Sequence, residues 1–254
     1  MRIAVCIKRV PITGGRILLT EDSTAINTQH LGFTMSPHEE CGVEEAARLI
    51  ETNKGDSVVL TLGPPEALEQ LRDAMALGID RAIHLQTDGQ EWDAEATASA
   101  LLEAIRADEA TNGPFDIVFF GNESADSGGF QVGIRVAYSL GRPCVTGLKK
   151  VTLEASSVRC EQEVEGGRDV YVVPLPAVLT VKEGLNLPRY PSVPGKMRAR
   201  SKPVAVTTPT RPAPRLELVR LAVPAGQGRR AESLGNGATA APAVVEVLRK
   251  AGVL

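Results

Sequence analysis

The chain has 254 residues, and its 43% hydrophobic and 23% charged content excludes collagen-like, coiled-coil and wholly disordered classes. Its 28 basic and 31 acidic residues give a formal charge of −3, and aromatic residues are only 4%, so no nucleic-acid surface is expected. No apolar run reaches membrane-spanning length, and the first residues follow a strand pattern rather than that of a signal peptide, so we expect no membrane insertion.

The first half of the chain alternates strand and helix patterns. Apolar, β-rich runs at 2–8, 57–62, 81–85 and 115–120 predict buried parallel strands. A helical pattern follows each of them, or the loop after it. This alternation predicts an α/β fold, an open parallel sheet with helices on both faces.

The first of these helices has a clear start signature. Ser36 is the expected N-cap, Pro37 the first helical residue and Glu39 the capping-box partner. We interpret the acidic side chains of this helix as solvated charges that complement its dipole; they are Glu39, Glu40, Glu44 and Glu45.

Past residue 143 the pattern changes to shorter β-like runs. Those at 149–154, 157–164, 169–173 and 177–182 predict a small antiparallel section. We therefore expect residues 1–182 to form one α/β domain with an antiparallel extension.

The remaining residues divide into two segments. Closely spaced prolines over 183–203 predict an extended arm that cannot fold into a helix. The last segment, 204–254, is expected to carry a late strand at 216–223 and a C-terminal helix at 239–251.

Ligands of open parallel sheets bind beyond the carboxyl ends of the strands, and the loop at 121–132 is the most informative candidate there. Gly128 and Gly129 let backbone amides approach an anion at a helix N-terminus. The loop has no Lys or Arg and is not a P-loop, so amides and the hydroxyl of Ser127 would hold a phosphate. Asp126 would accept hydrogen bonds from amides or from a ribose hydroxyl. A plain connecting loop with a glycine turn remains the alternative.

Residues with catalytic or metal-binding chemistry are few. His30, His38 and His84 fall in separate elements, and no serine-hydrolase, zinc-protease or kinase motif is present. The cysteines are far apart and include no CxxC pair, which argues against a zinc or iron–sulfur site and is typical of a cytoplasmic protein. We expect no catalytic residue and no metal.

The arm offers apolar side chains on a locally basic segment. Tyr190, Val193 and Met197 are its exposed apolar candidates, and its basic residues lie between 196 and 202. A stiff segment of this kind suits docking onto a protein partner, and an interdomain linker is the other reading.

Five segments, in order and at matching spacing, resemble the β subunit of electron transfer flavoprotein. They are VCIKRVP at 5–11, the helix start at 36–46, RDAMALGIDRA at 72–82, the loop GNESADSGGFQVG at 121–133 and PRYPSVPGKMRARSKP at 188–203. This resemblance covers the chain to about residue 203. It implies an adenine-nucleotide α-hydrolase-like fold.

The resemblance also implies a function, that of an electron carrier and not of an enzyme. Members of the family pair with an α subunit that holds most of the redox FAD. The heterodimer takes electrons from flavin dehydrogenases and passes them to a quinone oxidoreductase (the ETF-quinone oxidoreductase) or another acceptor. The β subunit usually holds a buried AMP, and residues 204–254 would lie as a strap and helix across the α subunit.

Site residues follow from the same resemblance. The residues expected to contact AMP are Ile7, Lys8, Gly63, Asp126, Ser127, Gly128, Gly129, Phe130, Gln131 and Val132. Those expected to dock on a dehydrogenase are Tyr190, Pro191, Ser192, Val193, Pro194 and Met197, with Val193 where the family usually has leucine.

Three alternatives stay open. In electron-bifurcating relatives a second FAD occupies the place of AMP. A freestanding adenine-nucleotide module of the universal-stress type and a nucleotide-dependent enzyme are the others, but neither needs the arm. The close match of the arm to the family pattern favours AMP over FAD.

Overall fold

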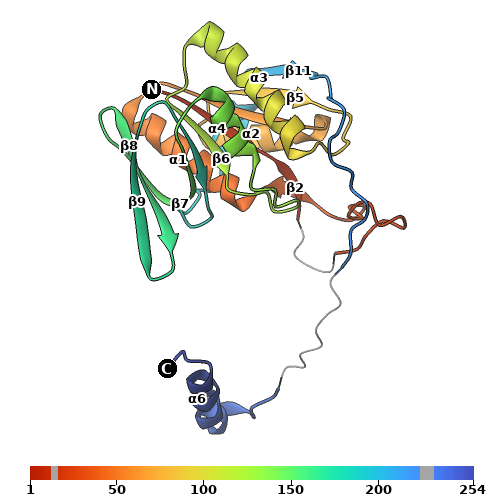
Figure 1. Cartoon of the computed structure of the whole chain (residues 1–254), viewed down its shortest axis with the longest axis vertical. Helices are drawn as coiled ribbons and strands as arrows, with labels where there is room; N and C mark the ends of the chain where they lie inside the picture. The colour runs from red at the N-terminus through yellow and green to blue at the C-terminus, as the bar shows by residue number, and fades with distance from the viewer. Residues whose placement is uncertain (13–16, 224–231) are drawn as a thin grey trace.

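A nine-stranded sheet forms the centre of the molecule (Figure 1). The structure is a computed structural model that describes residues 1–12, 17–223 and 232–254. The strand order is β11-β5-β4-β1-β6-β10-β7-β8-β9, in which β11 through β7 are parallel and β8 and β9 are antiparallel. The strands are β1 (Arg2–Ile7), β4 (Asp56–Gly63), β5 (Arg81–Gln86), β6 (Ile117–Gly121), β7 (Cys144–Leu153), β8 (Ser157–Val164), β9 (Gly167–Pro174), β10 (Ala177–Val181) and β11 (Val204–Thr207). Two further short strands, β2 (Arg9–Pro11) and β3 (Phe33–Met35), pair with each other.

Helices cover both faces of the sheet, as the alternating side chains of β1 require. Ile3, Val5 and Ile7 are buried in one core cluster, which includes side chains of α1 and α2. Ala4 and Cys6 are buried in the other, which includes side chains of α3 and α4. The helices are α1 (Pro37–Asn53), α2 (Leu68–Ala76), which follows the short 3₁₀ helix η1 (Pro65–Ala67), α3 (Ala94–Asn112) and α4 (Val132–Leu140). The predicted α/β fold class is confirmed.

The predicted antiparallel section is correct for β7, β8 and β9 but wrong for the run at 177–182. That run is β10, which lies parallel between β6 and β7. All five residues of β10 are buried. Burial on both faces is typical of a central parallel strand, and it explains why four of the five residues in this run are apolar.

The arm is not extended throughout, and the prediction that it cannot form a helix is wrong. Residues 193–201 form α5 (Val193–Ser201). Pro194 lies in the first turn, where no intrahelical bond is needed from the nitrogen that proline lacks. Ser192 caps the helix, because its Oγ accepts a hydrogen bond from the amide of Gly195 at 3.1 Å.

The segment after the arm also differs from the prediction. Residues 204–207 form β11 at the sheet edge beside β5, and residues 216–223 form no strand. The C-terminal helix is present as α6 (Ala241–Lys250), after the 3₁₀ helix η2 (Gly237–Ala240), and none of its residues is buried. Residues 224–231 of the predicted strap lie outside the described residues.

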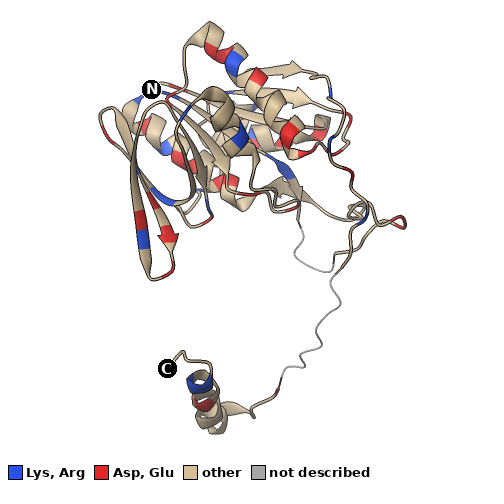
Figure 2. Cartoon of the chain, viewed as in Figure 1, with Lys and Arg blue, Asp and Glu red and all other residues tan. Residues whose placement is uncertain are grey.

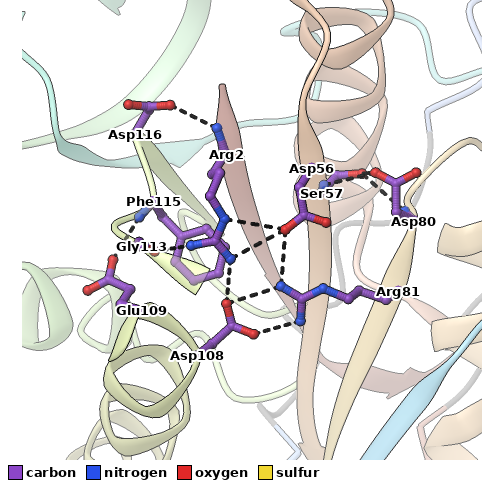
Figure 3. Close-up of polar contacts among 10 residues, drawn as sticks. All are labelled: Arg2, Asp56, Ser57, Asp80, Arg81, Asp108, Glu109, Gly113, Phe115 and Asp116. Atoms are coloured by element: carbon purple, nitrogen blue, oxygen red, sulfur yellow. Dashed lines mark hydrogen bonds and ion pairs between the residues drawn. The ribbon is translucent and has the colours of Figure 1, made fainter. Parts of the chain in front are cut away.

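A network of charges joins the amino ends of β1, β4 and β5 to α3 (Figure 3). The carboxylate of Asp108 lies 2.6 Å from Arg2 and 2.6 Å from Arg81. Asp56 lies 3.3 Å from Arg2 and 3.1 Å from Arg81. The guanidinium of Arg2 also stacks 4.4 Å above the ring of Phe115. These contacts fix the amino ends of the strands, and the candidate site lies at their carboxyl ends.

Acidic and basic residues are interspersed along the exposed helices, as Figure 2 shows. Within the described ranges, no helix has the length and apolar character needed to cross a bilayer.

Candidate functional site

A pocket of about 390 Å³ lies beyond the carboxyl ends of β6 and β10, against the N-terminus of α1. The loop after β6 and the start of α1 form its walls. Its lining residues are Ser36, Pro37, His38, Glu123, Ser124, Ala125, Asp126, Ser127, Gly128 and Glu183.

The N-terminus of α1 brings an unsatisfied hydroxyl to this pocket. Ser36 is fully buried, and its Oγ has no hydrogen-bond partner among the described residues. Its carbonyl accepts hydrogen bonds from the amides of Glu39 and Glu40. The positive end of a 17-residue helix dipole lies beside it, which favours an anionic group.

Lys8 ties the loop after β6 to the end of β1. Its Nζ lies 2.8 Å from Asp126 and 3.3 Å from the Oγ of Ser127. Glu91 lies 2.8 Å from the same Nζ. Burial opposes a charged Lys8, but the two carboxylates outweigh it and raise the pKa of Lys8. Burial likewise opposes a charged Asp126, and the ammonium of Lys8 outweighs it and lowers the pKa of Asp126.

Asp126 also shapes the loop itself. Its Oδ1 accepts a hydrogen bond from the amide of Ser127 at 2.7 Å. The hydroxyls of Ser124 and Ser127 lie 2.9 Å apart at the pocket wall. The loop therefore presents two hydroxyls beside one ion pair, and Gly128 follows with a positive φ of 55°.

Glu39 is buried beneath this loop, and no reciprocal capping box forms, because the hydroxyl of Ser36 makes no hydrogen bond to the helix. Its Oε2 accepts a hydrogen bond from the amide of Lys8 at 2.5 Å. A Cβ at Gly121 would lie 2.7 Å from the Cγ of Glu39, so only glycine allows the loop to start so close to this carboxyl. Burial raises the pKa of Glu39 to about 8, although the hydrogen bond from Lys8 lowers it in part.

The interpretation of the α1 acidic residues as solvated is therefore wrong. Glu39 is 7% exposed and Glu44 is 1% exposed, and Glu40 and Glu45 are half-buried. The acidic side chains of α1 pack against other parts of the chain. The sequence of the helix alone does not show that they are buried.

His38 joins the pocket to the end of β10. Its Nδ1 accepts a hydrogen bond from the amide of Glu183 at 2.6 Å. The proton is then on Nε2, which lies 3.4 Å from a carboxylate oxygen of Glu123. Three segments far apart in sequence thus meet at this wall of the pocket.

Only some of the residues expected to contact AMP line the pocket. Asp126, Ser127 and Gly128 line it, and Lys8 reaches its wall through Asp126. The others lie outside the lining; they are Ile7, Gly63, Gly129, Phe130, Gln131 and Val132. Of these, Phe130 is 53% exposed, and Gln131 binds Arg135 through its side chain at 3.1 Å.

Ser36, His38 and Glu183 are lining residues that the expected AMP contacts did not include. The Ser36–Pro37 helix start was a usable signal for the first two, because a helix that follows the first strand begins at the carboxyl edge of the sheet. Glu183 gave no such signal, because its placement depends on β10 being parallel to β6.

The predicted docking residues lie on the turn before α5 and on its first two turns. Their apolar side chains are strongly exposed: Tyr190 is 97% exposed, Val193 73% and Met197 67%. Leu187, which was not predicted, is 85% exposed beside them. We call these four residues the docking face.

No cluster of metal-binding side chains occurs in the described part of the chain. Two of the histidines are engaged separately. His38 is at the pocket wall, and Nε2 of the buried His84 lies 3.2 Å from the carbonyl of Gly63.

The chain resembles proteins of one family over most of its length. Residues 23–212 match the model of the electron transfer flavoprotein domain. The electron transfer flavoprotein subunit beta of Mycobacterium tuberculosis is 36% identical over 212 residues, which cover 81% of this chain and 78% of that protein. The same subunit of Bacillus subtilis is 33% identical over 206 residues, with 80% and 77% covered. The mitochondrial subunit beta of Arabidopsis thaliana is 35% identical over 211 residues and 82% of each chain. On this similarity, which includes the loop and the arm described above, the chain belongs to the electron transfer flavoprotein β-subunit family.

Proposed function

We propose that this chain is the β subunit of a heterodimeric electron transfer flavoprotein. The heterodimer accepts electrons from flavin dehydrogenases and passes them to a quinone oxidoreductase or another acceptor. The observation that carries the proposal is the family match, which spans both the pocket and the docking face. The chain acts as an electron carrier and not as an enzyme, in a reducing compartment such as the cytoplasm, which suits its four free cysteines.

The C-terminal segment supports an α-subunit partner. An isolated helix of ten residues is marginal in water, so α6 needs a surface to pack on. Its exposed apolar residues include Val244, Val245, Val247 and Leu248. More apolar side chains are exposed between β11 and α6, among them Leu216 and Val219 at 75% and 80%. Together they form an apolar strap that the α subunit would cover.

The pocket fits AMP. The start of α1 and the hydroxyls of Ser124 and Ser127 would face a phosphate, and Asp126 suits a ribose hydroxyl. A volume of about 390 Å³ is at the small end of the roughly 300–1,000 Å³ of ligand pockets, which favours AMP over the much larger FAD. AMP has no redox chemistry, so its role here is to satisfy buried polar groups and stabilise the fold by binding only the native state.

The redox FAD belongs mainly to the α subunit and supplies the electron-accepting centre. The part of this chain is to hold the α subunit through the strap and to present the docking face to the dehydrogenase. The basic residues beside that face would speed encounter with an acidic partner surface more than they tighten binding.

Co-expression with an α subunit tests the proposal. We expect a yellow heterodimer whose flavin is reduced when a flavin dehydrogenase of the same cell and its substrate are added. Acid release of the ligand from the purified β chain should give absorbance at 260 nm alone. A yellow extract would instead identify FAD in this pocket and a bifurcating subunit. A colourless heterodimer, or one whose flavin no dehydrogenase reduces, contradicts the proposal.

A further inference from the structure

One face of α1 binds the segment that leads into the docking face. Residues 41, 44, 45, 48 and 51 are spaced by three or four positions, so they form a single stripe on the helix. Every one of them contacts residues 186–189 through a hydrogen bond or ion pair. The stripe is therefore a continuous seat for this short segment.

Asn186 and Leu187 are the first residues of the segment that α1 binds. The side-chain amide of Asn186 donates to the carbonyl of Cys41 at 3.1 Å and to the carboxylate of Glu45 at 2.9 Å. The guanidinium of Arg48 donates to the carbonyl of Leu187 at 3.2 Å. These contacts hold the chain where the docking face begins, at Leu187.

Arg189 makes the strongest contacts with the seat. Its two terminal nitrogens donate to the two carboxylate oxygens of Glu51 at 2.7 and 3.1 Å, which is the paired geometry that only arginine offers. Its Nε lies 2.9 Å from Glu44, and its backbone amide donates to the same carboxylate at 3.2 Å. Hydrogen bonds to Glu51 and Glu44 raise the pKa of Arg189. The hydrogen bond from Arg189 in turn lowers the pKa of Glu51.

The other end of the docking face is fixed by α2. A Cβ at Gly195 would lie 2.6 Å from the carbonyl oxygen of Ala76, so α5 approaches α2 as closely as glycine permits. The Nζ of Lys202 donates to the carbonyls of Met75 and Ile79 at 3.0 and 2.6 Å. The segment is thus held at both ends, while the side chain of Tyr190 between them is 97% exposed.

We infer that Arg189 and its two partners on α1, Glu44 and Glu51, are positioning residues for partner docking. They hold the docking face in its binding geometry before the partner arrives. A partner that meets a preformed surface does not have to order it, so less binding free energy is lost. The inference rests on the proposed function, because it takes the docking face to be the dehydrogenase site.

Glu51 provides the sharpest variant, since it lies outside the docking segment and its side chain is 55% exposed. Glu51→Gln removes the charge and one of the two oxygens that Arg189 binds, without changing the segment itself or burying a new group. Arg189→Gln removes all of the side-chain contacts, and Arg189→Lys keeps the charge without the paired geometry. Glu103→Gln, on the exposed face of α3, is the matched loss of one acidic charge.

Hydrogen exchange of the heterodimer tests whether the contacts hold the segment. We expect faster exchange at the amides of 186–193 in Glu51→Gln, a larger increase in Arg189→Gln and an intermediate one in Arg189→Lys. Arg198→Gln is the control within α5, because Arg198 has no ion pair among the described residues and its loss should leave exchange at 186–193 unchanged. Equal exchange in wild type and Arg189→Gln overturns the inference, whatever the function of the chain.

Steady-state electron transfer from a reduced flavin dehydrogenase tests the consequence. We expect the KM for the heterodimer to rise roughly 3- to 10-fold in Arg189→Gln and less in Glu51→Gln, with kcat unchanged, because a loosened surface binds more weakly but reacts normally. Glu103→Gln should keep the wild-type KM.

Two results of the electron-transfer assay would overturn the inference, and they differ in what they say of the proposed function. An unchanged KM in Arg189→Gln, with the wild type active, overturns the positioning role alone. A wild-type heterodimer that no dehydrogenase reduces overturns the proposed function and the positioning role with it.

Discussion

The ammonium of Lys8 lies 2.8 Å from the carboxylate of Asp126, and this pair joins the end of β1 to the loop that walls the pocket. Both side chains are mostly shielded from water, at 28% and 17% exposure; Lys8 favours the charge of Asp126, and Asp126 and Glu91 together favour the charge of Lys8. The loop would lose its tie to the sheet if either were removed.

Replacing Lys8 with methionine should therefore lower both stability and nucleotide content. We expect a loss of about 1–2 kcal/mol in the free energy of unfolding, because Asp126 keeps its charge without the cation. Urea denaturation measures the first effect, and the ratio of released nucleotide to protein measures the second.

The double variant Lys8→Met/Asp126→Asn provides the control. With both charges removed, the combined loss should be smaller than the sum of the two single losses. Strictly additive losses would show that the two side chains act independently and would contradict the role of the pair.

Glu39 should make stability fall as pH rises. Its pKa is raised to about 8 in the folded chain from 4.5, so between these values the folded state keeps a proton that the unfolded state has lost. Its contribution is fully present below about pH 4.5 and is lost as the pH approaches 8. The limiting slope from one such group is about 1.4 kcal/mol per pH unit.

The variant Glu39→Gln isolates this effect, since glutamine keeps the shape and can still accept from the amide of Lys8. Relative to wild type, the variant should gain stability steadily between pH 5.5 and 7.5 in urea denaturation. Parallel pH profiles for the two proteins would mean that Glu39 is already ionised in the folded state.

Asp108 should contribute stability with the opposite pH dependence. Burial opposes its charge, but hydrogen bonds from Arg81 and Arg2 outweigh burial and lower its pKa. Its contribution is therefore present above its unfolded value of 3.8 and is lost as the pH falls through the lower folded pKa. Asp108→Asn should cost about 2–3 kcal/mol at pH 7, because two arginines lose a shared partner that is only 6% exposed.

The difference between Asp108→Asn and wild type should shrink below about pH 4 in thermal or urea unfolding. The bound nucleotide should be unaffected, since the network lies at the opposite edge of the sheet from the pocket. A variant that lost nucleotide at full stability would contradict this separation.

Charges placed on α6 should separate assembly from folding. Val244→Asp/Leu248→Asp should abolish co-purification with the α subunit, because both side chains are exposed apolar residues one helical turn apart. The unfolding of the β chain alone should not change, since no residue of α6 is buried. Glu246→Gln is the control within the same helix, and retention of the heterodimer in the double variant would refute the role of α6.

Much of the fold could be predicted because its central strands are short, apolar and regularly interrupted by helices. The error at β10 arose because AVLTV follows β7, β8 and β9, whose consecutive pairings are antiparallel, and a short apolar run does not state which strand it pairs with. The helix α5 was not predicted because closely spaced prolines usually exclude a helix, whereas Pro194 occupies the first turn, where proline is tolerated.

The glycine loop after β6 was a correct sequence signal for one wall of the pocket. The other wall, at the start of α1, was not predicted. Glu39 and His38 have the pattern of an ordinary exposed helix start, and only the assembly of the central sheet brings them beside Gly121 and Glu183. The seat on α1 is similar: the three-and-four spacing of residues 41 to 51 is visible in the sequence, but its occupant lies about 145 residues later.

The position of β11 has a mechanical consequence. The docking helix α5 ends at Ser201, and β11 begins at Val204 and is hydrogen-bonded in register to β5. The carbonyl of Pro203 also accepts from the amide of Ala82, so the first residues after α5 are already part of the sheet. A force applied to α5 would therefore pass into the central sheet at β11 before it reached the residues that follow.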